Sequence, residues 1–231
     1  MNLFYQPHIA DGILNLNAEE SRHAIKVLRM VKGDALHLTD GKGFFYTAQI
    51  TEADAKKCSF EIIDKKQSPK RDYQIHIAIA PTKNADRMEW FVEKATEIGI
   101  DKISFILCRN SERKTINLDR IEKIAISAMK QSGQAWLPKV SSIVPFNEVL
   151  KHNVSQKFIA FVDEKNTNHL KSVAKSNGNY LVLVGPEGDF SQEELNLALE
   201  NNFKKVSLGN NRLRTETAGL VACQVLNLIN N

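Results

Sequence analysis

The chain has 231 residues, enough for one large domain or two small ones, each with its own hydrophobic core. Hydrophobic residues make up 42% and charged residues 25% of the sequence, values that exclude a disordered or fibrous chain and are ordinary for a globular protein. The formal net charge of +4 permits a nucleic-acid partner without requiring one.

The cysteines and the hydropathy pattern indicate where such a chain would work. The three cysteines are widely separated and show neither metal nor redox spacing, and their small number and placement are typical of a reducing compartment. No apolar run reaches membrane-spanning length, and the first residues lack the order of basic and apolar regions found in a signal peptide. We therefore expect a cytoplasmic protein with no membrane association, and no residue pattern predicts a metal site.

The first 70 residues are predicted to be rich in β-strand. Strand-like runs at residues 35–38, 44–50 and 58–63 are separated by polar turns, and one helical pattern covers residues 19–30. This pattern predicts a small barrel or sandwich. Residues 65–72 are charged, contain a proline and lack apolar anchors, so they are the expected linker.

After residue 73 the pattern changes to strands alternating with helices. Strands are predicted at residues 75–80, 103–107, 158–162, 180–184 and 205–208, and helices at 86–98, 117–132, 169–175, from 191 and 216–229. This alternation predicts an α/β domain with a parallel sheet covered on both faces. We therefore expect two domains, residues 1–70 and residues 73–231.

The last predicted helix, residues 216–229, is apolar on more than one side. A helix that is apolar around most of its circumference is buried on several faces. Burial within the monomer explains this pattern, and so does a homodimer interface.

Two loops between a predicted strand and a predicted helix could form a ligand site. The first loop is residues 185–190 and the second loop is residues 209–214. In a parallel sheet both would lie at the carboxyl ends of strands, where open α/β folds bind ligands. The glycines of the first loop let a ligand approach the main chain, and Ser191 with Glu194 forms a capping-box pattern. An ordinary strand-to-helix turn would explain the first loop equally well.

The second loop is harder to explain by turn chemistry. Arg212, Arg214 and Glu216 crowd one strand–helix junction, where structure alone requires only a turn and a cap. An arginine there can bind a phosphate or a carboxylate through its planar guanidinium, although a local salt bridge between Arg214 and Glu216 is also consistent with the spacing. Neither loop has a Walker or Gly-x-Gly-x-x-Gly pattern, so no phosphate cradle is expected.

Several motifs together resemble one known family. They are GPEGDFSQEE at residues 185–194, LGNNRLRTETAG at 208–219, HAIKVLRM at 23–30, PTKNADRMEW at 81–90, EKATEIGI at 93–100 and QSGQAWLPKV at 131–140. Their order and sequences resemble the ribosomal RNA small subunit methyltransferase E family, within the SPOUT (trefoil-knotted) RNA methyltransferases. The resemblance extends over nearly the whole chain.

The resemblance implies a fold, a cofactor and a reaction. The implied fold is an amino-terminal PUA-like β-barrel followed by an α/β SPOUT domain whose carboxyl-terminal part forms a deep trefoil knot. The implied reaction is methylation of N3 of a uridine in 16S rRNA near the decoding centre of the small ribosomal subunit, by a homodimer that uses S-adenosyl-L-methionine (SAM). The cofactor-binding positions implied in this sequence are Val184, Gly185, Pro186, Glu187, Gly188, Leu208, Gly209, Asn210, Leu213, Arg214, Thr215, Thr217 and Ala218.

Catalytic and RNA-binding roles follow from the same resemblance and from charge. Arg214 or nearby main-chain amides are expected to stabilise the charge that develops on the uracil oxygens, while Glu216 either accepts a proton or holds Arg214. RNA phosphates are expected to contact Arg22, His23, Arg29, Lys32, Lys83, Arg87, Arg109 and Arg113.

The chain departs from the family pattern at the predicted site. The family often has a glycine where this chain has Asp189, and Arg-Ile where it has Asn211-Arg212. Many relatives have Glu-Gln-Ser-Gly-Arg where this chain has residues 130–134, so a basic contact to RNA is missing there. These departures keep open an alternative function, a catalytically inactive RNA-binding factor for ribosome assembly with the same fold.

Overall fold

The computed structural model describes residues 2–163 and 168–231, and the chain divides into two compact units. The amino-terminal unit contains Met1–Lys70 and Ile126–Leu137, and the carboxyl-terminal unit contains Arg71–Ala125 and Pro138–Asn231. The sequence had assigned residues 126–137 to the second domain. They cluster with the first 70 residues instead, because the carbonyl of Ala135 accepts a backbone hydrogen bond from Gly43 and the N–H of Leu137 donates one to Gly41.

The amino-terminal unit is built on a four-stranded sheet in the order β1-β2-β3-β4. Its strands are β1 (Leu3–Tyr5), β2 (Ala35–Thr39), β3 (Phe44–Glu52) and β4 (Ser59–Gln67). β1 is parallel to β2, and the other two pairs are antiparallel. Alternate residues such as Leu36, Leu38, Ala48 and Ile50 are buried and form the core with Phe4. The predicted strands are therefore confirmed, but β4 extends three residues into the predicted linker.

The single helix predicted for residues 19–30 is two shorter segments. A 3-10 turn, η1 (Ile9–Asp11), precedes α1 (Ala18–Arg22), which begins where the side chain of Asn17 accepts a hydrogen bond from the backbone N–H of Glu20 at 2.9 Å. The chain then forms a π-helix, η2 (His23–Val27). Arg29 has φ of 57°, a left-handed conformation that no α-helix continues through.

The carboxyl-terminal unit contains a six-stranded sheet in the order β10-β8-β9-β5-β6-β7, and every neighbouring pair is parallel. The strands are β5 (Gln74–Ile79), β6 (Lys102–Leu107), β7 (Lys139–Pro145), β8 (Gln156–Ala160), β9 (Asn179–Val184) and β10 (Lys204–Val206). The predicted parallel sheet is confirmed. β5 and β9 occupy its middle, and their residues are buried almost without interruption, as parallel strands covered on both faces require.

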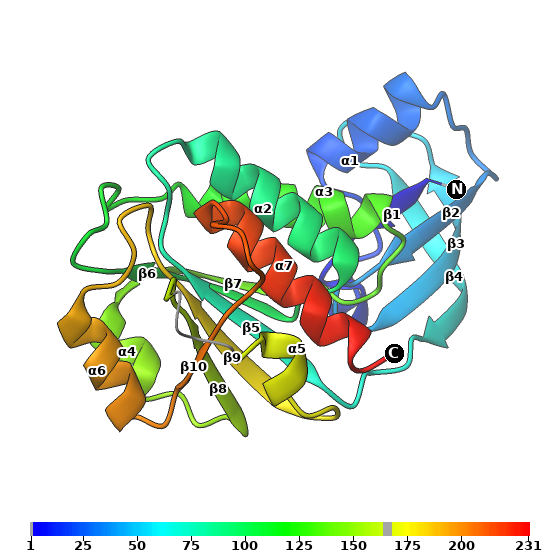
Figure 1. The fold of residues 1–231 in the computed structure, drawn as a ribbon. Coiled ribbons are helices and arrows are strands. Elements are labelled where there is room, and N and C mark those ends of the chain that lie inside the picture. Colours follow the sequence, from blue (N-terminus) through cyan, green and yellow to red (C-terminus); the bar gives the residue numbers. More distant parts are fainter. Residues whose placement is uncertain (1, 164–167) are drawn as a thin grey trace. The chain divides into compact units, whose positions relative to one another are not determined.

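Helices cover both faces of this sheet (Figure 1). α2 (Ala85–Ile98) packs beside α7 (Thr215–Leu228) on one face, where a Cβ added at Gly219 would lie 2.7 Å from Phe91 and 2.9 Å from Ile79. On the other face α4 (Phe146–Leu150) and α6 (Gln192–Glu200) share a core with Ala78 and Ala80 of β5. The remaining helices are α3 (Leu118–Gln131) and α5 (Leu170–Val173).

β1, β7 and α4 were not predicted from the sequence. β7 lies at the edge of the sheet, and its half-exposed residues show neither a continuous apolar run nor a regular alternation. Within the part of the chain that is described, no helix is long and apolar enough to cross a membrane.

Candidate functional site

A cavity of about 530 Å³ opens at one edge of the six-stranded sheet. It lies where the adjacent parallel strands β8, β9 and β10 end, so the segments that follow these strands meet around it. Its walls are formed by Arg87, residues 160–163, residues 184–187, Asp189, residues 206–215 and Ala218. The first and second loops therefore line one cavity, as their positions after parallel strands predicted.

The two loops are joined to each other by a buried side chain. The hydroxyl of Thr215, the first residue of α7, donates a hydrogen bond to the backbone carbonyl of Gly185 at 3.0 Å. In the first loop, Phe190 is buried and packs on Phe146 of α4 with 5.6 Å between ring centroids. The predicted capping box is present, with Ser191 and Glu194 bonded reciprocally at the start of α6. These contacts fix the first loop from both of its ends.

Neighbouring loops support the first loop from outside the cavity. The amide of Asn110, after β6, donates to the carbonyl oxygens of Gly188 and Asp189 at 3.2 and 3.1 Å. The backbone N–H of Lys83, after β5, donates to Glu187 Oε1 at 3.1 Å. The loops after β5, β6 and β9 consequently form one hydrogen-bonded rim.

The second loop presents two cationic side chains to the cavity. Arg212 and Arg214 both line it and are exposed, and among the described residues neither guanidinium has a hydrogen-bond or ion-pair partner. The loop begins with Gly209, whose φ is 143° and whose Cβ position is open space. The backbone of this loop is therefore accessible to a ligand.

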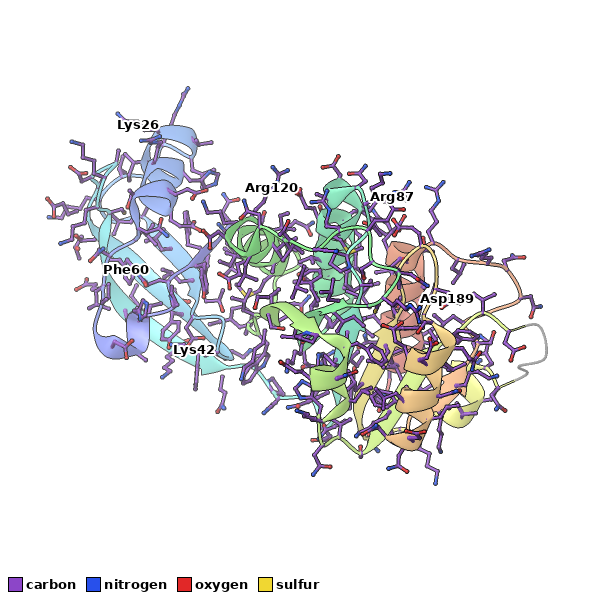
Figure 2. All side chains as sticks on the ribbon, turned by 90° about the vertical axis from the view of Figure 1, so that its left-hand side faces the viewer. Lys26, Lys42, Phe60, Arg87, Arg120 and Asp189 are labelled. Carbon is purple, nitrogen blue, oxygen red and sulfur yellow. The ribbon has the colours of Figure 1, made fainter. Side chains whose placement is uncertain are left out.

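The acidic residue predicted to act with Arg214 is paired elsewhere. Glu216 Oε1 lies 3.7 Å from Arg87 Nε, so the local Arg214–Glu216 salt bridge considered from the sequence is not formed. The side chain of Glu216 is buried, and its second oxygen, Oε2, has no hydrogen-bond partner among the described residues. Arg87 extends from the first turn of α2 (Figure 2), which brings it to the first turn of α7.

Asp189 contributes a carboxylate to the cavity wall (Figure 2). Its φ is 60°, and its two oxygens accept hydrogen bonds from the backbone N–H groups of Phe190 at 2.8 Å and Val162 at 3.3 Å. Burial raises the pKa of this carboxyl, an effect opposed by the two backbone hydrogen bonds and by the charge of Arg212.

Most residues predicted to bind a cofactor are brought together by the structure. All of them line the cavity except Gly188, which packs against Asn110, and Thr217, in the first turn of α7. The sequence did not indicate residues 160–163, which lie at and just after the end of β8, as part of the site, and Arg87 was predicted to bind RNA alone. Only the strand order could have revealed the segment after β8, because nothing in its own sequence is characteristic of a site.

The residues predicted to bind RNA lie in both units. In the amino-terminal unit Arg22, His23, Arg29 and Lys32 are all exposed, in or just after α1 and η2. In the carboxyl-terminal unit Lys83 and Arg109 form surface ion pairs with Glu112 and Glu193, at 3.2 and 2.9 Å. Arg113 donates to the backbone carbonyls of residues 82 and 83. These last three side chains therefore also hold the rim of loops together.

Comparison with known proteins gives the same fold and a family. A family model described as an RNA methyltransferase domain matches residues 69–227, and one described as an RNA methyltransferase PUA domain matches residues 16–63. A ribosomal RNA small subunit methyltransferase E from Rickettsia conorii is 30% identical over 220 residues, covering 94% of this chain and 90% of that protein.

Two solved structures extend the likeness to the whole chain. A probable rRNA-methyltransferase from Porphyromonas gingivalis matches with a TM-score of 0.93 and 44% identity, covering 99% of this chain and 98% of that one. A ribosomal RNA small subunit methyltransferase E from Neisseria gonorrhoeae, solved with bound S-adenosyl methionine, matches with a TM-score of 0.85 and 28% identity, covering 100% and 98%.

Proposed function

Because this chain belongs to the RNA methyltransferase family, among the proteins named ribosomal RNA small subunit methyltransferase E, we propose that it methylates N3 of a uridine in 16S rRNA, near the decoding centre. It is a SAM-dependent rRNA methyltransferase. The observation that carries the assignment of the site is the cavity lined by the first and second loops.

The residues around this cavity fit SAM. About 530 Å³ is the size of an ordinary small-molecule site. Apolar walls for an adenosine are provided by Ala160, Phe161, Val184, Leu208 and Leu213, and the open space beside the main chain at Gly209 leaves room for a ligand. SAM supplies the electrophile, a methyl group carried on its sulfonium. The chain must hold that group in line with the attacking nitrogen and exclude water.

Arg214 is proposed as the residue that acts on the uracil. N3 of uridine carries a proton, and when that proton leaves, negative charge spreads to O2 and O4. A guanidinium at the cavity wall with no protein partner is suited to stabilise this charge in the transition state, and Arg214 has such a guanidinium among the described residues. The uridine must leave its stack to reach the cavity, as bases do in other enzymes that modify them.

RNA positioning is proposed for the basic residues of both units. Arg22, His23, Arg29 and Lys32 would contact phosphates from the amino-terminal unit, and Lys83, Arg109 and Arg113 from the rim of loops. Phosphate contacts position an RNA without reading its sequence and weaken as salt rises. We also propose that the protein works in the cytoplasm, since its proposed substrate is rRNA.

The direct test compares the nucleosides of 16S rRNA from cells with and without the gene by mass spectrometry. We expect 3-methyluridine to disappear without the gene and to return when purified protein and SAM are added to small subunits. If the modification persists in the deletion strain, the proposed position of methylation is wrong. If the protein binds RNA, but neither SAM binding nor formation of 3-methyluridine is detected, the alternative function as an inactive ribosome-assembly factor is correct.

We also propose that the first unit closes as a PUA-like barrel and that the carboxyl-terminal part forms a trefoil knot. The matched PUA domain supports the first proposal. For the second, β10 pairs with β8 at one edge of the sheet, while the following α7 returns to pack on α2 and β5. A diffraction structure traced from end to end decides both, and an unknotted trace would exclude the second.

A homodimer is proposed from the apolar surface of α7. Leu228 is 62% exposed, and Leu220, Val221 and Val225 of the same helix are only partly buried. Light scattering should give twice the chain mass of 26.0 kDa. Leu228→Glu should shift the mass towards the monomer, whereas Gln224→Glu, at an exposed position of the same helix, should not. A wild-type protein of monomer mass would rule out the dimer.

A further inference from the structure

Two opposite charges lie on different loops of the same cavity without forming an ion pair. Asp189 belongs to the first loop and Arg212 to the second, and both line the cavity. The charge of Arg212 is close enough to act on the carboxyl of Asp189, yet the described residues contain no direct ion pair between them. A ligand group that carries both a positive and a negative charge could contact both.

The local backbone fixes the orientation of the Asp189 carboxylate, so that it can contact a positively charged ligand group. Its φ of 60° is a left-handed conformation in which glycine is less strained than any residue with a side chain. Each carboxylate oxygen accepts one backbone hydrogen bond, from Phe190 or from Val162, and each has a further lone pair. The carboxylate is therefore fixed in orientation at the cavity wall and can still accept hydrogen bonds.

Apart from Arg214, the other charged groups of the cavity are engaged within the protein. Asp163 is paired with Lys205, Glu187 accepts a hydrogen bond from the backbone of Lys83, and Arg87 is paired with Glu216. Arg214 is the residue proposed to act on the uracil. Among the residues that the structure describes, Arg212 remains as the guanidinium of the cavity with no partner and no proposed role, and its planar fork matches a carboxylate.

We propose that Asp189 and Arg212 bind the amino-acid end of SAM, with the ammonium on Asp189 and the carboxylate on Arg212. This inference rests on the proposed function, since it takes SAM as the ligand. The α-amino acid group carries both charges on one carbon, which suits a carboxylate and a guanidinium that face one cavity from two loops. The pair would thus fix the methionine chain and, through it, the sulfonium.

The test measures binding by calorimetry, with three ligands that share the adenosine and differ in the amino-acid end. SAM has both charges, decarboxylated SAM lacks the carboxylate, and 5′-methylthioadenosine lacks the whole amino-acid end together with the sulfonium charge. Asp189→Asn preserves a side chain that tolerates the left-handed backbone, and Arg212→Gln removes the guanidinium. The matched controls are Asp119→Asn and Arg120→Gln, which remove the same charges from exposed positions outside the cavity.

Each substitution should weaken SAM binding by about tenfold to about a hundredfold, the usual worth of a charge-assisted hydrogen bond. Asp189→Asn should weaken the binding of decarboxylated SAM by a similar factor, whereas Arg212→Gln should leave the affinity for decarboxylated SAM unchanged. Neither should change the affinity for 5′-methylthioadenosine, and the controls should bind all three ligands as the wild-type protein does.

Two results would overturn the inference alone. One is wild-type affinity for SAM in both variants, and the other is an equal loss for SAM and 5′-methylthioadenosine, which would mean that the residues only shape the cavity. A wild-type protein that binds 5′-methylthioadenosine and SAM equally would also exclude a site for the amino-acid end. If the wild-type protein binds no SAM at all, the proposed function itself fails.

Discussion

Glu216 and Arg87 join the first turns of α7 and α2 through an ion pair with 3.7 Å between Oε1 and Nε. The side chain of Glu216 is 9% exposed and that of Arg87 36%, so the carboxylate is buried and the guanidinium partly solvated. With Oε2 unpartnered among the described residues, Arg87 is the principal compensation for a buried negative charge.

Removing the side chain of Arg87 should therefore lower the free energy of unfolding more than neutralising Glu216 does. Arg87→Ala leaves the buried carboxylate without its counter-ion and should lower the free energy of unfolding by about 2 kcal/mol, discounted because Arg87 is partly exposed. Glu216→Gln keeps the shape of the side chain and should cost less than about 1 kcal/mol. Urea unfolding of both variants and of the double variant measures the coupling between them. If Arg87→Ala lowers the free energy of unfolding by the same amount whether residue 216 is Glu or Gln, the ion pair contributes nothing to stability.

Arg214 should matter for the rate of methyl transfer rather than for folding. Because its guanidinium has no protein partner among the described residues, Arg214→Ala should leave the unfolding free energy nearly unchanged. The single-turnover rate on small subunits should fall by about 100-fold to about 1,000-fold, the loss typical when one stabilising donor is removed. Arg214→Lys should recover only part of it, because an ammonium lacks the planar fork. Calorimetry with SAM provides the control, and an unchanged rate in Arg214→Ala would remove the residue from the proposed mechanism.

Gly219 should tolerate no side chain, although it lies inside a helix. A Cβ there would lie 2.7 Å from Phe91 and 2.9 Å from Ile79, both of which are fully buried. Gly219→Ala should gain about 1 kcal/mol of helix propensity but lose about 1 to 3 kcal/mol from overpacking, so a net loss is expected. Gln224→Ala, at an exposed site of the same helix, should change stability by less than about 0.5 kcal/mol. A more stable Gly219→Ala variant would show that α7 can move away from α2 at little cost.

His76 should make the carboxyl-terminal unit less stable in acid. It is buried on β5, shares a 2.8 Å hydrogen bond with Ser104, and packs its ring on that of His152 at 5.3 Å. Burial, helped by the charges of Lys102 and His152, lowers the pKa of His76 from 6.5 to about 3. Between these two values the unfolded chain binds a proton that the folded chain does not, so stability falls as the pH falls below about 6.5.

The size of this loss can be measured against a variant without the imidazole. From about pH 7.5 to about pH 5, the wild-type protein should lose about 2 kcal/mol more than His76→Gln, at about 1.4 kcal/mol per pH unit. The pKa of His152 is also lowered, mainly by burial, and His152 is present in both proteins, so it does not enter the difference directly. Parallel curves for wild type and His76→Gln would contradict a neutral buried imidazole.

Local patterns in the sequence were enough to predict most of the regular elements. The spacing of apolar residues along one side predicted α2 and α3, and Gly99 ends α2 with a φ of 105°, as expected of a glycine at that position. The capping box of Ser191 and Glu194 was readable because its two partners are three residues apart. These features depend on interactions within one or two turns, which the sequence displays directly.

The sequence by itself therefore determined the alternation of strands and helices, the two loops at strand ends, and the family resemblance of their motifs. The tertiary structure alone decided which distant residues meet: Arg87 with Glu216, Asp189 with Arg212 across one cavity, and residues 126–137 with the amino-terminal unit. The physical reason is that pairing between distant segments follows from strand order and helix packing. These are set by burial summed over the whole core, and no short stretch of sequence records them.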